Sequence, residues 1–297
     1  MPENEVTLRM RRRAKELLAG GEVQQVIGWE KGTFWYQSPP VFIRQPEEAD
    51  RLVWDDFCLA NPAIYLLDDR YGQERVGLFV KGCDARAVVR LIQDRQLVRE
   101  RVYLLGIPCP GLKDPEAART TGRESAQLPP ARRCQHCLYP NPVLYDELLA
   151  QTVAPRPPLA PRAAVKALEA KGVEERFRYW REHFRRCLRC FACRNVCPAC
   201  NCTACLFDLA RPTWLAKEVD PANNWFYGLV RALHVAGRCI ECGECERVCP
   251  VGLPLMALNE KLAKDLEELF GFKGAGLDLE GLPPLSFWQP DDPDHFA

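Results

Sequence analysis

The cysteines carry the clearest chemical pattern in the sequence. Residues 187–198 read C-L-R-C-F-A-C-R-N-V-C-P, and residues 239–250 read C-I-E-C-G-E-C-E-R-V-C-P. Both follow C-x2-C-x2-C-x3-C-P, in which three thiolates on one tight loop reach three corners of a 4Fe–4S cubane. Structural zinc favours two separate C-x2-C pairs. The spacing therefore predicts iron–sulfur clusters rather than zinc.

The fourth cysteine of each motif is expected to cross over, because in two-cluster ferredoxins it binds the cluster of the other motif. Site 1 is then formed by Cys187, Cys190, Cys193 and Cys249. Site 2 is formed by Cys239, Cys242, Cys245 and Cys197. Two adjacent clusters pass single electrons, so the pattern predicts an electron-carrying protein.

The remaining cysteines form two further groups. Site 3 consists of Cys83, Cys109, Cys134 and Cys137, which predict a third cubane, with zinc or free thiols as the alternatives. The last group is Cys58, Cys200, Cys202 and Cys205. Because the 16 cysteines would fill four cubanes, this group is a candidate fourth cluster, and spare buried thiols are the alternative.

No catalytic constellation accompanies the cysteines. The histidines His136, His183, His234 and His295 show no ligand spacing, and each is expected to be structural or exposed. The sequence contains no G-x-G-x-x-G fingerprint, so no motif supports bound FAD. We therefore predict no catalytic residue.

Composition excludes several classes of protein. Lys plus Arg equals Asp plus Glu at 40 each, so global charge does not favour nucleic acid or an anionic membrane. No apolar stretch approaches the roughly 20 residues that span a bilayer. The start, Met1-Pro2-Glu3-Asn4-Glu5, lacks the layout of a signal peptide. A cytoplasmic protein is expected, where cysteine serves metals more often than disulfides.

The first half of the chain alternates helix-like and strand-like segments. A helix is expected over residues 5–18, followed by a hairpin of residues 23–29 and 33–36. Further strands are expected at residues 64–67, 76–80 and 102–107. Asp84 is the expected N-cap of a helix between the last two strands. This βαβ arrangement predicts an α/β domain with a short mixed sheet, whose loops at the ligand-binding edge carry Cys83 and Cys109.

The second half has a helical pattern. Helices are expected over residues 176–186, 223–236 and 255–269, the last as a leucine stripe. We expect four parts: an α/β domain (1–152), a Pro-rich linker (153–162), a helical ferredoxin-like domain (163–273) and a tail (274–297). The tail, with Phe287 and Trp288, is expected to be extended or to dock on a partner.

The charges around the two loops differ. Arg185, Arg186, Arg189 and Arg194 surround the first loop, and Glu241, Glu244 and Glu246 interleave the second. Positive charge stabilises a reduced cluster, so site 1 would have the higher potential. The alternative is solvated surface charge that salt screens.

Two resemblances follow from these motifs. Residues 233–255, L-H-V-A-G-R-C-I-E-C-G-E-C-E-R-V-C-P-V-G-L-P-L, resemble the helical dicluster module of fumarate reductase and heterodisulfide reductase iron–sulfur subunits. K-G-C-D-A-R-A, G-I-P-C and R-A-L-H-V-A-G-R-C resemble the β-subunit family of deazaflavin-dependent (coenzyme F-420 type) hydrogenases and dehydrogenases. This second resemblance covers roughly residues 20–270, and it implies an α/β domain that can hold a flavin and a cluster.

The leading hypothesis is an electron-transfer subunit of an anaerobic oxidoreductase complex. It would relay electrons between a formate dehydrogenase or hydrogenase type of subunit and a flavin or heterodisulfide-reductase-like partner. One alternative is a flavin-containing subunit that reduces or oxidises a deazaflavin or nicotinamide cofactor. The other is a redox-sensing or zinc-stapled interaction module.

Overall fold

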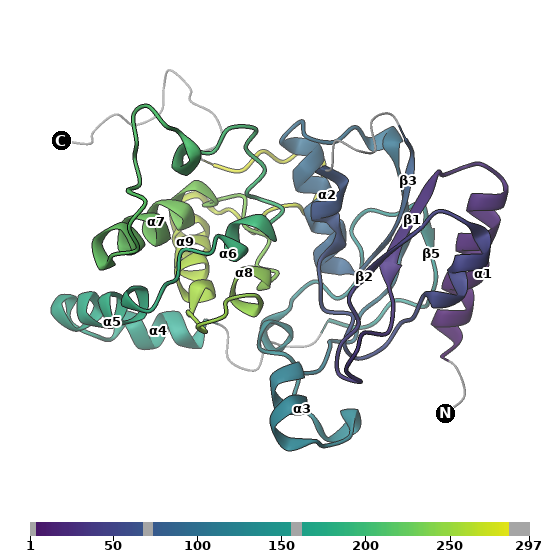
Figure 1. The fold of residues 1–297 in the computed structure, drawn as a ribbon, viewed down its shortest axis with the longest axis horizontal. Coiled ribbons are helices and arrows are strands. Elements are labelled where there is room, and N and C mark those ends of the chain that lie inside the picture. The colour runs from purple at the N-terminus through teal and green to yellow at the C-terminus, as the bar shows by residue number, and fades with distance from the viewer. Residues whose placement is uncertain (1–3, 68–73, 156–161, 285–297) are drawn as a thin grey trace.

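The computed structural model describes residues 4–67, 74–155 and 162–284 (Figure 1). The first half is built on a five-stranded sheet with the order β2-β1-β3-β4-β5. The strands are β1 (Gln25–Trp29), β2 (Pro40–Ile43), β3 (Val76–Val80), β4 (Val102–Gly106) and β5 (Glu147–Leu148). β2 pairs antiparallel with β1, and all other pairs are parallel. The predicted short mixed sheet is therefore confirmed.

One long helix covers each face of the sheet (Figure 1). α1 (Glu5–Ala19) packs on the face that carries Val26, and α2 (Gly82–Gln93) packs on the face that carries Ile27. Because both faces are buried, the strands read as continuous apolar runs in the sequence. A short helix, α3 (Pro115–Thr121), projects beyond the sheet.

Two predicted strands are wrong. Residues 33–36 form a turn that is closed by hydrogen bonds from Gly32 N to Gln37 O (3.0 Å) and from Gln37 N to Phe34 O (2.9 Å), so the hairpin strand comes later, as β2. Residues 64–67 belong to a 3₁₀ helix over Pro62–Leu67. Asn61 Oδ1 accepts a hydrogen bond from Ala63 N (3.1 Å) and starts that turn.

The position of Asp84 is also corrected. α2 begins at Gly82, so the N-cap is Lys81 and Asp84 lies in the first turn. The Asp84 carboxylate accepts a hydrogen bond from Lys81 N (2.9 Å), so it still satisfies a free donor at the helix start. The predicted helix of residues 5–18 and the strands 76–80 and 102–107 are confirmed.

The second half is a group of helices around a small core. The longer helices are α4 (Ala163–Glu169), α5 (Val173–Arg185), α7 (Pro221–His234) and α9 (Leu255–Phe270). α6 (Ala192–Asn195) and α8 (Glu244–Arg247) are single turns within the two cysteine motifs, and each carries the third cysteine of its motif. Trp180, Phe184 and Met256 pack together with Cys245 in this core. The three helices expected here are confirmed as α5, α7 and α9.

The expected linker and tail fall partly outside the described residues. Residues 156–161 of the linker and residues 285–297 of the tail, including Phe287 and Trp288, are not described. The beginning of the tail packs on α2, where Arg86 Nε donates to Ala275 O (3.0 Å) and Gln93 Nε2 donates to Asp278 O (2.9 Å). Among the described helices, none is both long enough and apolar enough to cross a bilayer.

Candidate iron–sulfur centres

The two cysteine loops share one backbone conformation. Arg189 (φ 47°) and Glu241 (φ 58°) occupy equivalent positions, and both are left-handed. Phe191 (φ 58°) and Gly243 (φ 71°) are a second left-handed pair, and each immediately precedes its single helical turn. Such turns direct successive backbone N–H groups toward a common anion, as in many iron–sulfur sites.

Backbone N–H groups already point at cysteine sulfurs in both loops. Arg189 N donates to Cys187 Sγ (3.4 Å), and Glu241 N donates to Cys239 Sγ in the same way (3.4 Å). Hydrogen bonds of this kind stabilise charge on thiolate ligands and tune cluster potentials. The backbone of each loop is thus preorganised for a bound cluster.

The structure brings the four cysteines of site 1 together. They line one cavity below α7: Cys187, Cys190, Cys193 and Cys249. Burial raises the pKa of the Cys187 thiol, and its three neighbours raise it further. Leu253 N donates to Cys249 Sγ (3.3 Å), and the Tyr227 hydroxyl lies 3.4 Å from Cys193 Sγ.

The four cysteines of site 2 also meet. α6 packs against α8. This contact brings Cys197, at the end of the first motif, close to the second motif. Burial raises the pKa of Cys239, and the nearby thiols of Cys197, Cys242 and Cys245 add to the rise. The crossed arrangement expected from the spacing is therefore present, while iron ligation by these residues stays a prediction.

Site 3 is assembled from three separate segments. Cys109 N donates to Pro140 O (2.8 Å), and Leu112 N donates to Cys134 Sγ (3.4 Å), which ties the loop after β4 to residues 131–140. At the start of α2, a Cβ on Gly82 would collide with the Tyr139 carbonyl. Only glycine permits this approach, which brings the segment carrying Cys137 close to Cys83.

The thiols of site 3 lie within electrostatic range of one another. Burial raises the pKa of Cys109 to about 12, and Cys134 and Cys137 contribute to the rise. Burial and Asp84 raise the pKa of Cys83 well above its usual value, with a smaller contribution from Cys137. Buried thiols of this kind must lose protons to bind metal, so metal binding and deprotonation are coupled here.

The cysteine groups can be compared with the geometry that a single metal ion requires. Among residues 4–67, 74–155 and 162–284, no group of three or more His, Cys, Asp or Glu side chains is close enough to hold one metal ion. The thiolates of a zinc site all bind one metal at about 2.3 Å. The thiolates of a cubane bind different iron atoms and are spaced farther apart.

Two buried arginines near the sites were not anticipated from the sequence. Arg231 Nη2 donates to Cys193 O (2.9 Å), and its Nε has no hydrogen-bond partner within the described part of the chain. Burial opposes its charge, but the surrounding thiols raise its pKa well above the usual value; they are Cys197, Cys245, Cys200 and Cys193. Arg231 therefore lies between sites 1 and 2. In the sequence, the indication that Arg231 is buried is its place on the apolar face of α7.

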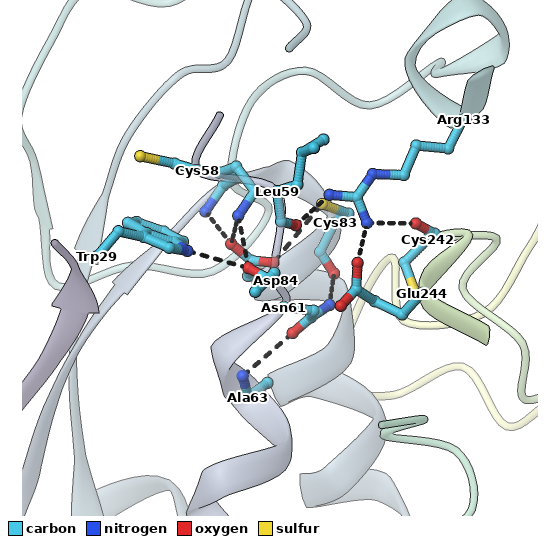
Figure 2. A network of polar contacts seen from close by, with 12 residues as sticks. Trp29, Cys58, Leu59, Asn61, Ala63, Cys83, Asp84, Arg133, Cys242 and Glu244 are labelled. Atoms are coloured by element: carbon cyan, nitrogen blue, oxygen red, sulfur yellow. Dashed lines mark hydrogen bonds and ion pairs between the residues drawn. The ribbon is translucent and has the colours of Figure 1, made fainter. Parts of the chain in front are cut away.

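Arg133 occupies the equivalent place between sites 2 and 3. It lies in the R-R-C-Q-H-C segment and donates to Cys242 O (2.8 Å), to the Glu244 carboxylate and to Leu59 O (Figure 2). Its neighbour in the sequence, Arg132, is largely exposed and pairs with Glu246. Nothing in the local sequence distinguishes the two arginines, so only the structure identifies the buried one.

The fourth candidate group is not brought together. Cys58 is buried in the core of the first half, where Asp55 N donates to its sulfur (3.3 Å) and the sulfur points away from Cys83 (Figure 2). Cys200 lies beside Cys197, Cys202 is exposed and Cys205 lies near Arg194. A fourth cluster therefore remains a prediction that these contacts do not support.

The charges near the loops are not simply surface charge. Arg189 is buried and donates to Ala216 O (2.6 Å) and Lys217 O (2.7 Å), so it holds a neighbouring loop. Burial opposes ionisation of Glu244, yet Arg133 and Arg247 hold its pKa at about 2. Both charges are paired or hydrogen-bonded, which weakens the simple contrast between the two loops.

Two of the described histidines pack against aromatic rings. The His183 ring lies 4.2 Å from the Tyr179 ring, and the His234 ring packs 6.4 Å from the Phe207 ring. His136 lines a cavity of about 1450 Å³ beside site 3. His295 lies outside the described residues.

The cavity beside site 3 is bordered by Tyr36, Phe57, Tyr65, Lys81, Arg86 and all four cysteines of site 3.

Comparison with known proteins identifies the class of these centres. A family model described as a 4Fe-4S dicluster domain matches residues 183–253, which contain both repeats of the cysteine motif. The predicted pair of 4Fe–4S clusters is thereby confirmed, as is the prediction of an iron–sulfur electron carrier. The dicluster domain binds two 4Fe–4S clusters.

Curated relatives extend the similarity to the rest of the chain. The F420-dependent formate dehydrogenase subunit beta of Methanocaldococcus jannaschii is 31% identical over the matched region. That region covers 40% of this chain and 31% of the relative. The F420-dependent formate dehydrogenase 1 subunit beta of Methanococcus maripaludis is 24% identical, over 91% of both proteins. The acetyl-CoA decarbonylase/synthase complex subunit alpha 1 of Methanosarcina barkeri is 29% identical over 44% of this chain and 14% of its own length. The predicted resemblance to the deazaflavin-dependent β-subunit family is confirmed.

Proposed function

We propose that this chain is an iron–sulfur electron-transfer subunit of an oxidoreductase complex and that three 4Fe–4S clusters form its path. The observation that carries the proposal is the serial arrangement of the cysteine groups. Arg231 donates to Cys193 O (2.9 Å) of site 1, and α6 after site 1 packs against α8 of site 2. Arg133 donates to Cys242 O (2.8 Å) of site 2 and directly precedes Cys134 of site 3. Site 2 is therefore the middle of the path, and electrons pass between sites 1 and 3 through it.

The partners follow from the relatives. Two of them are named as formate dehydrogenase β-subunits and a third as part of a multi-subunit acetyl-CoA complex. We propose a catalytic partner of the formate dehydrogenase or hydrogenase type at one end of the path. A flavin or heterodisulfide-reductase-like partner would stand at the other end. A cytoplasmic location and the division into an α/β domain and a helical ferredoxin domain belong to the same proposal.

A second candidate function is supported by the large cavity. Ligand sites usually measure about 300–1,000 Å³ and combine aromatic walls with a few polar groups. The cavity of about 1450 Å³ has such walls and borders site 3, so a flavin bound there would exchange electrons with that cluster. In this version the chain itself reduces or oxidises a deazaflavin or nicotinamide cofactor. Bound flavin in protein purified without oxygen separates this candidate from the first.

The deciding measurement is iron, acid-labile sulfide, zinc and flavin per chain on anaerobically purified protein. Three clusters give about twelve irons, and two give about eight. Cys83→Ser combined with Cys109→Ser is expected to remove about four irons. Cys58→Ala is the matched control at a buried cysteine outside site 3 and is expected to remove none. Zinc without sulfide would favour the interaction-module alternative and overturn the proposal.

A further inference from the structure

A buried ion pair joins sites 2 and 3. The Arg133 side chain is 10% exposed and the Glu244 side chain only 1%. Arg133 comes from the segment that carries Cys134 and Cys137, whereas Glu244 begins α8 and stands between Cys242 and Cys245 of site 2. Figure 2 shows the guanidinium between Cys83 on one side and Cys242 with Glu244 on the other. The pair thus spans the space between two predicted clusters.

The surrounding chain is built to hold this guanidinium. Arg133 donates to two backbone carbonyls, Cys242 O (2.8 Å) and Leu59 O, as well as to the Glu244 carboxylate. A Cβ at Gly243 would lie 2.8 Å from Arg133 Cβ, so the glycine leaves room for the side chain. Burying charges costs several kcal/mol per ion unless the geometry is well satisfied.

The charge of Arg133 acts on both sites. Arg133 directly precedes Cys134 of site 3 in the sequence and donates to Cys242 O (2.8 Å) of site 2. Its guanidinium also lies beside Cys83 of site 3 (Figure 2). Arg247 also donates to the Glu244 carboxylate (2.8 and 2.9 Å), so Glu244 keeps a cationic partner when Arg133 is replaced.

We propose that the Arg133–Glu244 pair sets the reduction potentials of the site 2 and site 3 clusters together. The inference rests on the proposed three-cluster path. The step it serves moves one electron from a reduced cluster to an oxidised one, with no bond formed or broken. A positive charge held near two clusters stabilises the reduced form of both, so the two potentials rise together and the difference between them changes little.

Two substitutions test the proposal with opposite signs. Arg133→Met keeps the length of the side chain and removes its charge, so the reduction equilibria of two clusters should shift about tenfold toward the oxidised form. For one-electron couples this is about 59 mV. Glu244→Gln removes the negative charge and should shift the same two clusters toward the reduced form. Redox titration followed by electron paramagnetic resonance measures each shift.

The controls separate charge from structure. Arg133→Lys keeps the charge and is expected to stay within about threefold of the wild-type equilibria. Arg132→Met removes the adjacent, exposed charge and is expected to leave all potentials unchanged, because water and salt screen it. Iron per chain is measured for every variant, which shows whether the clusters are present.

The outcomes divide cleanly. Opposite shifts of the same two clusters in Arg133→Met and Glu244→Gln, with full iron content, support the inference. Unchanged potentials in both variants, with about twelve irons, overturn it and leave the three-cluster path intact. If wild-type protein holds only about eight irons, the three-cluster path itself fails. If Arg133→Met loses iron, the Glu244→Gln and Arg133→Lys titrations decide the question.

Discussion

At the scale of single residues, Gly243 shows how one conformation is used in two ways. Gly243 and Phe191 hold the same left-handed position in the two loops. The Phe191 ring extends away and packs on the Tyr227 ring (5.2 Å). At Gly243 that space is taken by Arg133, whose Cβ would be 2.8 Å from any added Cβ. A phenylalanine adopts this backbone in the first motif, so the second motif needs glycine chiefly because Arg133 lies where a Cβ would be.

Gly243→Ala is expected to destabilise site 2 more than backbone strain alone explains. A non-glycine residue in the left-handed region costs of order 1–3 kcal/mol, and the contact with Arg133 adds to it. Gly252→Ala is the matched control, because Gly252 (φ 60°) has no atom near the position of an added Cβ. Urea unfolding of iron-loaded protein measures both variants. Equal losses would show that the contact with Arg133 contributes nothing.

The Lys81–Asp84 pair gives a second residue-scale prediction. The two side chains are 1% and 0% exposed, and Lys81 Nζ lies 2.7 Å from the carboxylate and 4.0 Å from the centre of the Trp29 ring. Removing one partner of a buried pair costs about 3–5 kcal/mol, because the other charge is left unpaired. Lys81→Met should therefore lower the free energy of unfolding by about that amount.

Thermal and urea unfolding measure the effect of Lys81→Met. Lys15→Met is the control, since Lys15 forms an exposed pair with Asp50 and is expected to leave the unfolding midpoint unchanged. If Lys81→Met is as stable as the wild type, then Asp84 takes up a proton when its partner is removed. The carboxyl would in that case be neutral in the variant.

The candidate site illustrates what residue patterns can and cannot predict. Cysteine spacing was sufficient to group sites 1 and 2, because a cubane demands a fixed arrangement of thiolates. It also suggested site 3, although only the missing Cβ of Gly82 explains how Cys137 approaches Cys83. Arg133 and Arg231 could not be found in this way, because burial of an arginine depends on segments far away in the sequence.

At the scale of helices and strands, long periodic segments were predictable and short ones were not. α1, α5, α7 and α9 have apolar stripes that repeat over several turns. Residues 64–67 form a run of only four apolar residues, which does not distinguish a strand from a helical turn. The Asn61 side chain accepts a hydrogen bond from Ala63 N and so stabilises the helical turn. β5 has two residues, which is too short for a sequence pattern, and it is a strand because it lies beside β4 and pairs with it.

Glu260 on α9 gives a pH-dependent prediction. Burial raises its pKa to about 7, and the nearby carboxylates of Glu241 and Glu246 add to the rise. The unfolded value is about 4.3, so between about pH 4.3 and 7 the folded state holds the proton more tightly. Stability from this group is present below pH 4.3 and is lost as the pH rises through 7.

Glu260→Gln is accordingly expected to match the wild type near pH 4 and to exceed it in stability near pH 7.5. Urea midpoints at the two pH values measure the difference. Glu268→Gln, on the same helix but at an exposed position, should change neither midpoint. A Glu260→Gln advantage of equal size at both pH values would mean that the effect is not due to ionisation.

At the scale of the whole molecule, α2 connects the two halves at both of its ends. Its first turn carries Cys83 of site 3, beside the Arg133 junction. Its C-cap, Asp94, accepts hydrogen bonds from Asn201 (2.8 Å) and Arg238 (2.7 Å) in the second half. These contacts hold α2, and with it Cys83 of site 3, against the second half, which carries site 2. Electron transfer along the proposed path depends on the distance between sites 2 and 3.

Asp94→Asn is therefore expected to loosen the molecule as a whole. The change weakens two charge-assisted hydrogen bonds, worth about 1.5–3 kcal/mol each. One joins Asp94 to Arg238 across the contact between the halves, and the other joins it to Arg90 within α2. Anaerobic urea unfolding should then separate into two transitions, one followed by cluster absorbance and one by far-ultraviolet circular dichroism. Asp146→Asn breaks a comparable pair with Arg99 inside the first half and should lower stability while leaving one transition. A single transition in Asp94→Asn would show that the halves are held together by apolar packing around Ile240 and Ala275 instead.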